Sequence, residues 1–231
     1  MIADNLGAVR ERVARACLAA GRSVQSVTLV AVSKTVSDIA VREAHAAGQP
    51  RFGENYVQEG VEKILALHDL RSALDWHMIG PLQANKTRLI AEHFDWVHSV
   101  DRLRIAQRLS EQRGSGREPL QVCLQVNVSG ESSKGGVAPH DLAELAHAVQ
   151  GLPGLRLRGL MSIPEPSDAA TVQRAAHRML REMLGVLNAD GLHLDTLSMG
   201  MTGDLEAAIA EGATLVRVGT AIFGARPPRG V

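Results

Sequence analysis

The chain has 231 residues, enough for one large domain or two small ones. Its 25 Lys and Arg residues balance 25 Asp and Glu residues, which argues against a general nucleic-acid binder; aromatic residues, at 3%, are too few for base-stacking platforms. The two cysteines, Cys17 and Cys123, exclude a disulfide scaffold and a four-cysteine zinc site, and both lie in apolar patterns that predict buried positions.

The first residues show no basic stretch followed by an apolar block, and no apolar run approaches the length of a membrane span. We therefore expect a protein of the cytoplasm that binds neither a membrane nor nucleic acid.

Apolar residues at helical spacing predict a first helix that starts at Ile2 and ends at Gly21. A short apolar strand follows at 27–32, and then a helix that Ser37 caps and Gly48 ends. This strand-then-helix unit recurs along the chain. Further strands are predicted to start near Arg51, Asp75, Trp96, Leu120, Leu155, Thr196 and Leu215. Helices are predicted over 83–94, 101–113, 139–150 and 168–188, and over 204–209 with Thr202 as the N-cap.

The sequence predicts an α/β fold, a (β/α)8 TIM barrel with an extra N-terminal helix. The reason is that about 230 residues hold eight strands separated by helices, and many of these strands are continuous apolar runs. An open doubly wound sheet is the alternative, although it seldom needs eight similar units. The Gly- and Pro-containing clusters at 114–116 and 164–166 indicate loops and not linkers, so residues 1–231 are interpreted as a single domain.

A barrel of this kind carries its functional residues where the strands end, and Lys34 follows the first strand directly. Desolvation there would lower the pKa of the amine and let it attack an aldehyde to form a Schiff base. The other interpretation is a lysine that extends into solvent just past the strand.

Glycines mark the ends of the last two strands, with Gly200 and Gly203 after the seventh and Gly219 before Thr220 after the eighth. Loops at these positions form the usual phosphate-binding corner of the barrel, where N–H groups and the hydroxyls of Ser198 and Thr220 suit a phosphate. Strand eight pairs with strand one in a closed barrel, so this corner would lie beside Lys34. An aldehyde with a phosphate describes pyridoxal 5'-phosphate (PLP). A Schiff-base aldolase acting on a phosphorylated sugar would use the same parts.

Five strings of the sequence resemble the pyridoxal phosphate homeostasis protein family (YggS/PROSC type). They are AVSK at 31–34, FGENYVQE at 52–59, WHMIGPLQ at 76–83, RGLM at 158–161 and VRVGTAIFG at 216–224. The resemblance runs from the first helix to Arg226, which is essentially the whole chain.

The resemblance implies a fold-type-III barrel like the N-terminal domain of alanine racemase, with PLP bound covalently as a Schiff base on Lys34. It places Asn55 beside the cofactor ring and Arg217 against the pyridine nitrogen. It assigns the phosphate to Ser198, Gly219 and Thr220. One departure is that the family commonly reads Ser-x-Asp-Met where this chain has Thr-Gly-Asp-Leu at 202–205, and we expect the turn to persist.

An arginine only donates hydrogen bonds, so Arg217 against the ring nitrogen would favour the unprotonated ring and weaken the cofactor as an electron sink. Racemases of this fold also use a tyrosine from an additional domain as a second base, whereas the only tyrosine here is Tyr56 and we expect no such domain. We therefore expect a monomeric PLP carrier in cofactor homeostasis with no catalytic residues, and apo-forms of PLP-dependent enzymes as candidate recipients. A weak amino-acid racemase or another PLP-dependent enzyme is the alternative.

Three other groups of polar residues stand out in the sequence. His77, His98, Asp101 and Glu54 are interpreted as polar lining of the barrel mouth in preference to a metal cluster. Lys86 and Lys134 are interpreted as solvated loop lysines, with a role in PLP transfer as the alternative. Arg102, Arg104 and Arg108 are interpreted as a solvated helix face.

Overall fold

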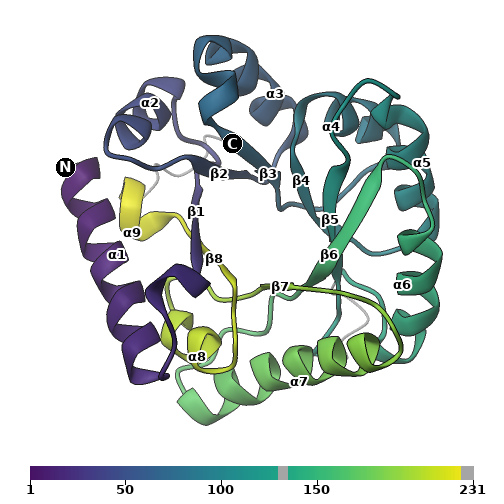
Figure 1. Cartoon of the computed structure of the whole chain (residues 1–231). Helices are drawn as coiled ribbons and strands as arrows, with labels where there is room; N and C mark the ends of the chain where they lie inside the picture. The colour runs from purple at the N-terminus through teal and green to yellow at the C-terminus, as the bar shows by residue number, and fades with distance from the viewer. Residues whose placement is uncertain (130–134, 225–231) are drawn as a thin grey trace, which may run out of the picture.

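The computed structural model describes residues 1–129 and 135–224, and in this part of the chain eight parallel strands close into a barrel in chain order (Figure 1). The strands are β1 (Thr28–Val32), β2 (Arg51–Glu54), β3 (Asp75–Met78), β4 (Trp96–Val100), β5 (Leu120–Gln125), β6 (Leu155–Met161), β7 (Thr196–Ser198) and β8 (Leu215–Val218). β8 pairs with β1, with Arg217 beside Val30, and this pairing closes the ring. The predicted TIM barrel is confirmed.

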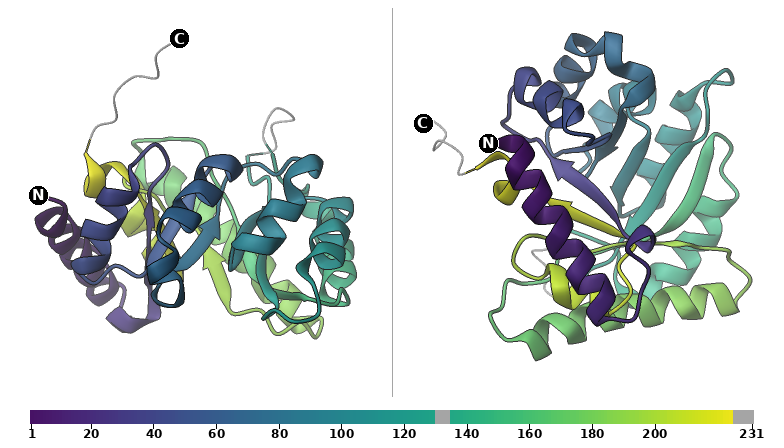
Figure 2. Two further views of the ribbon diagram at one scale, coloured as in Figure 1. Left: turned by 90° about the horizontal axis from the view of Figure 1, so that it is seen from above. Right: turned by 60° about the vertical axis from the view of Figure 1, so that its left-hand side comes forward.

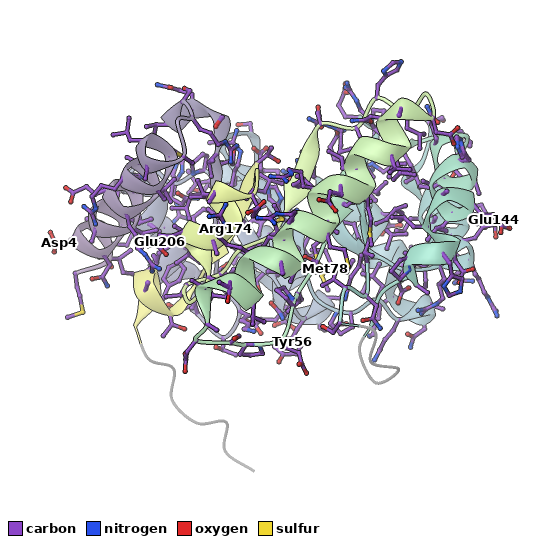
Figure 3. All side chains as sticks on the ribbon, turned by 90° about the horizontal axis from the view of Figure 1, so that it is seen from below. Asp4, Tyr56, Met78, Glu144, Arg174 and Glu206 are labelled. Carbon is purple, nitrogen blue, oxygen red and sulfur yellow. The ribbon has the colours of Figure 1, made fainter. Side chains whose placement is uncertain are left out.

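Helices surround the strands on the outside of the barrel (Figures 1 and 2). They are α1 (Ile2–Ala19), α2 (Asp38–Ala46), α3 (Val57–Ala66), α4 (Thr87–His93), α5 (Leu103–Arg113), α6 (Leu142–Gln150), α7 (Ala170–Ala189), α8 (Leu205–Ala210) and α9 (Thr220–Phe223). Asp4 on α1 and Glu144 on α6 mark opposite sides of the ring in Figure 3.

The extra N-terminal helix α1 is held by one apolar face. Leu6, Val9, Val13 and Cys17 are buried there at helical spacing, as the sequence predicts. Each such side chain contributes about 1.5–3 kcal/mol when it is fully buried. The helix lies diagonally across α8 and α9 (Figure 2), and the Asn5 side chain donates to the carbonyl of Ile222 at 2.9 Å. The helix therefore covers the seam where β8 meets β1.

The apolar core lies between the strands and the helices, because alternate strand residues point outward. Phe52, Trp76, Val97 and Val216 belong to this core. The residues between them face the barrel axis, and several are polar: His77, His98, Ser198 and Arg217. A hydrogen bond from β4 to β7, between non-adjacent strands, must cross the interior, which shows that this polar set fills the barrel.

Seven of the eight strands begin at the residue predicted, and β1 begins one residue later. Ser37 caps α2 as predicted, with its Oγ accepting the N–H of Ala40. The cap predicted for Thr202 is wrong. Asp204 occupies the N-cap position of α8 without a side-chain cap hydrogen bond, and its carboxylate accepts the N–H of Met201 in the preceding turn. The short helix α9 was not predicted.

Within the described residues, no helix is both long and apolar enough to cross a membrane. The cytoplasmic location stays a prediction.

Candidate functional site

A cavity of about 260 Å³ opens where β8, β1 and the loop after β7 end. Its lining residues are Val32, Lys34, Met201, Thr202, Gly203, Arg217, Gly219 and Thr220. Four of the six predicted site residues therefore meet in one pocket. The pairing of β8 with β1 is the reason, because it brings Lys34, which follows β1, beside Gly219 and Thr220, which follow β8.

Lys34 lies in a turn directly after β1. Ser33 before it is fully buried, Lys34 is half-buried, and Thr35 after it is exposed and has a φ of 61°. This left-handed backbone is uncommon for any residue other than glycine and is an outlier for a β-branched one. The turn leads the chain out of the barrel wall to the Ser37 cap of α2.

The glycine corner is formed by Gly200 and Gly203 after β7 and by Gly219 after β8. At Gly200 it depends on a close approach of the backbone to α8. A Cβ added to Gly200 would lie 2.5 Å from the Cβ of Ala208, and its φ of 92° favours glycine as well. Asp204 closes the turn by accepting the N–H of Met201 at 2.7 Å, and it contacts His177 at 2.9 Å. Burial acts to raise the pKa of this carboxyl, but these hydrogen bonds lower it overall. The turn predicted to persist is present.

Arg217 lines the inner wall of the pocket and is only 3% exposed. Its Nη1 donates to the Ser198 Oγ at 2.6 Å, and its Nη2 donates to the Ser162 carbonyl at 2.8 Å. Burial lowers the pKa of the guanidinium to about 10, so the side chain stays cationic at neutral pH. These two bonds hold the guanidinium in one orientation, in the same pocket as Lys34 and Thr220.

Beyond Arg217, a chain of hydrogen bonds runs through the barrel interior from Ser198 to His98 and on to His77. The Ser198 Oγ lies 2.7 Å from Nδ1 of His98, and Nε2 of His98 lies 2.9 Å from Nδ1 of His77. Arg217 donates to the Ser198 oxygen, and among the described residues His98 Nδ1 is the one acceptor that the Ser198 hydroxyl hydrogen contacts. The hydroxyl therefore donates to His98, and the N–H of each neutral imidazole lies on Nε2. Burial lowers the pKa of both histidines, that of His77 to about 3. The phosphate role predicted for Ser198 stays a prediction, since its side chain does not line the pocket.

The interpretation of His77 and His98 as lining of the barrel mouth is wrong, because both are fully buried along the axis. Glu54 is also buried, and its carboxylate contacts Lys63 on α3. No group of three or more His, Cys, Asp or Glu side chains in the described residues is arranged to hold a metal ion.

Asn55 and Tyr56 follow β2 but do not line the 260 Å³ pocket. The Asn55 Oδ1 is buried and has no hydrogen-bond partner among the described residues. Tyr56 is 42% exposed at the N-terminal end of α3, and Figure 3 shows it at the lower edge of the molecule. Asn55 therefore offers an unsatisfied acceptor near the strand ends, whereas Tyr56 lies at the surface.

Lys86 and the arginines at α5 differ in their exposure. Lys86 is half-buried and donates to the Gln58 side chain at 2.9 Å, and Lys134 lies outside the described residues. Arg102 and Arg104 are exposed as predicted. Arg108 departs from the predicted solvated face because it is only partly exposed, and its Nε donates to the Ala84 carbonyl at 3.0 Å, which joins α5 to the turn before α4.

Another cavity, of about 410 Å³, lies at the opposite end of the barrel among the first residues of several strands. Its charged side chains neutralise one another, since Arg51 pairs with Asp75 and Arg158 pairs with Asp195. We therefore place the functional site at the smaller pocket, where Arg217 meets Lys34.

The pocket suits PLP by its chemistry. It presents the primary amine of Lys34, the buried cation of Arg217 and the glycine corner. A Cβ added at Gly203 would meet nothing within 4 Å, so there is open space beside this glycine. The Ser162 Oγ and the Asn55 Oδ1 are buried polar atoms without partners among the described residues, but neither side chain lines this pocket.

The family model described as "Alanine racemase, N-terminal domain" matches residues 5–227. The alanine racemase of Corynebacterium glutamicum has the same fold, with a TM-score of 0.72 at 16% identity over 98% of this chain and 63% of that one. The fold and the site thus define a barrel of the alanine racemase N-terminal domain class.

Nearer relatives refine this assignment. The pyridoxal phosphate homeostasis protein of Pseudomonas aeruginosa is 64% identical over 97% of this chain and 96% of its own length. The Escherichia coli protein of the same name is 54% identical over 97% of both chains. The structure of PipY from Synechococcus elongatus with PLP bound superimposes with a TM-score of 0.86 at 40% identity, covering 97% of this chain and all of PipY. The chain belongs to the pyridoxal phosphate homeostasis protein family.

Proposed function

We propose that this chain binds PLP in the 260 Å³ pocket and acts in intracellular PLP homeostasis. The observation that supports this most is the meeting of Lys34, Arg217 and the Gly219–Thr220 corner in one cavity. The names of the relatives and the PLP in the PipY structure add to it.

Lys34 is the residue to which we assign the covalent link. Its Nζ attacks the aldehyde carbon of PLP, the C–N double bond of a Schiff base forms, and the aldehyde oxygen leaves as water. Gly219 and Thr220 hold the phosphate, and Asn55 accepts or donates beside the ring. Arg217 donates to the pyridine nitrogen from the position in which Ser198 and the Ser162 carbonyl hold it.

When bound, PLP supplies an electron-withdrawing ring, and the strength of that ring depends on the proton at its nitrogen. Arg217 has no proton acceptor on its guanidinium, and hence it favours the unprotonated ring. We propose for this reason that the chain stores and delivers PLP without efficient turnover, with apo-forms of PLP-dependent enzymes as recipients. Weak racemisation of amino acids is the second candidate, which the shared fold with alanine racemases favours.

We also propose that residues 1–231 form one domain and that the protein is a monomer. The observation that supports a single domain is that β8 pairs with β1, so the barrel needs strands from both ends of the chain. The monomeric state stays a prediction from the sequence.

The test is to add PLP to purified protein and to record the visible absorbance of the lysine-bound cofactor. Borohydride reduction and mass spectrometry then locate the modification among the four lysines of the chain. We expect it on Lys34 alone, and Lys34→Arg, which keeps the charge, is expected to abolish it. Modification at another lysine, or none at all, refutes the proposal.

A parallel assay follows racemisation of alanine and serine by the loaded protein. Turnover at ordinary enzyme rates of about 1 s⁻¹ or more, lost in Lys34→Arg, would replace the carrier function with the racemase alternative. Transfer to a recipient is measured as activity regained by an apo-enzyme that is mixed with the loaded protein.

A further inference from the structure

A buried ion-pair network lies behind the turn that carries Lys34. The Nζ of Lys63 donates to the Ser33 carbonyl at 2.5 Å, to Glu54 Oε1 at 2.8 Å and to Glu59 Oε1 at 2.7 Å. The Ser33 hydroxyl donates to the same Glu54 oxygen at 2.6 Å. The three hydrogens of the ammonium are therefore all used, as a side chain only 8% exposed requires.

The network joins three elements around the site. Ser33 follows β1, Glu54 is the last residue of β2, and Glu59 and Lys63 lie one turn apart on α3, which Figure 1 shows outside β2 and β3. Burial raises the pKa of Glu54, although its contacts with Lys63 and Ser33 act to lower it. A buried ammonium with this many partners has one favourable arrangement, because breaking any contact leaves a charge desolvated.

Glu59 connects this network to the turn itself. Its Oε1, which accepts from Lys63, also accepts the backbone N–H of Thr35. Thr35 has a φ of 61°, and its Oγ1 donates to the carbonyl of Lys34 at 2.6 Å. A left-handed conformation is unfavourable for threonine and persists only where the surroundings hold it. The carboxylate of Glu59 is the group that captures the N–H of this strained residue.

We propose that Glu59 and Lys63 are positioning residues for Lys34: they lock Thr35 in the left-handed conformation and so hold the amine of Lys34 toward the pocket before PLP arrives. This inference rests on the proposed function of Lys34. Glu59 makes the direct contact with the turn, and Lys63 fixes the carboxylate of Glu59 against Glu54. Neither residue lines the PLP pocket, so both act through the backbone at 33–35.

The test is a double-mutant cycle between Glu59→Ala and Thr35→Gly, with the dissociation constant of PLP as the readout. Glycine adopts a positive φ without strain and does not need the carboxylate to hold it there. We expect Glu59→Ala to weaken PLP binding about tenfold with threonine at position 35, which corresponds to about 1.4 kcal/mol. In the Thr35→Gly background we expect the same change to cost less than about twofold. Equal effects in the two backgrounds overturn the inference.

A second measurement uses the protein without PLP. Hydrogen exchange at the amide of residue 35 is expected to accelerate at least about tenfold in Glu59→Ala, because the amide loses its acceptor. Unchanged exchange overturns the inference whether or not Lys34 binds PLP. Absence of the Schiff base in the wild-type protein, with accelerated exchange in the variant, refutes the proposed function alone.

Two further variants complete the design. Glu62→Ala changes an exposed carboxylate on the same helix and is expected to leave PLP affinity and amide exchange unchanged. Lys63→Arg keeps a cation and is expected to retain more PLP affinity than Lys63→Met, with both variants confirmed as folded by circular dichroism. If Lys63→Met folds and binds PLP as the wild type does, Lys63 has no positioning role.

Discussion

Glu211 follows α8, and its carboxylate is the anchor for the long helix α7. The side chain is 1% exposed and accepts from three arginines spaced along one face of that helix, Arg174, Arg178 and Arg181. The shortest contacts are 2.7 Å, 3.1 Å and 2.8 Å. In Figure 3 Arg174 is labelled on α7, which crosses the front of the barrel in that view. We predict that Glu211→Gln loosens this helix.

The expected loss of stability in Glu211→Gln follows from how far the carboxylate and the three guanidiniums are buried. Hydrogen bonds to a charged group contribute about 1.5–3 kcal/mol when buried, whereas exposed ion pairs contribute below about 1 kcal/mol. Glu211 is buried, but the three guanidiniums are 45–50% exposed and can be hydrated when the charge is lost. We therefore expect Glu211→Gln to lower the free energy of unfolding by about 2–3 kcal/mol. For a chain of this size that corresponds to about 4–12 °C in Tm.

The assay is thermal unfolding of the wild type and the variant between pH 3 and pH 8. Burial acts to raise the pKa of Glu211, but the hydrogen bonds from Arg178 and Arg174 lower it overall. A carboxyl with a lowered pKa stabilises the protein above its unfolded pKa of about 4.3, and this contribution is lost as the pH falls through the folded value. The difference between wild type and variant should therefore shrink below about pH 4.

Glu206→Gln is the matched control for this prediction. Glu206 lies on the neighbouring α8 and also pairs with an arginine, Arg12, at 2.5 Å, but it is 55% exposed. We expect a loss below about 1 kcal/mol. If Glu211→Gln costs no more than Glu206→Gln, or if its cost does not depend on pH, the reasoning from burial is refuted.

Three further predictions concern glycine and histidine. Gly159→Ala should destabilise the protein by about 3 kcal/mol or more in denaturant unfolding, because the new Cβ would lie 1.8 Å from the carbonyl oxygen of Thr196. Gly185→Ala, where the Cβ meets nothing within 4 Å on helix α7, should stabilise it by about 0.5–1 kcal/mol; a loss there would contradict the helix-propensity argument. Nitrogen-15 NMR should show His77 and His98 neutral with hydrogen on Nε2 from pH 5 to pH 8. Because burial lowers their pKa values, stability should decrease as the pH falls below about 6.5, and a charged imidazole in this range would refute the assignment.

Much of the architecture was predictable from the sequence because its signals are local. Short apolar runs located the first residue of each strand to within one residue, and the Ser37 cap could be identified from the residue type and its position. Glycine at 200 and 219 and lysine at 34 could be assigned to strand ends for the same reason. The closure of eight units into a ring then implied that the first and last strands are neighbours, and hence that Lys34 lies beside the glycine corner.

The partners of buried polar groups were not predictable in this way. Lys63 has the sequence pattern of an ordinary helical lysine, and only its three contacts reveal it as the centre of a network under the Lys34 turn. His77 and His98 were predicted at the barrel mouth but lie along its axis, because β3 continues past His77 to Met78 and β4 continues past His98 to Val100.

The sequence by itself therefore determined the order of the elements, since each element depends on neighbours within a few residues. The count of eight strand–helix units then predicted the closed barrel, and with it the position of the amine beside the glycine corner. The tertiary structure decided which charges are desolvated and which groups satisfy them. That information depends on contacts between residues far apart in the chain, as between His98 and Ser198, and no local pattern in the sequence encodes it.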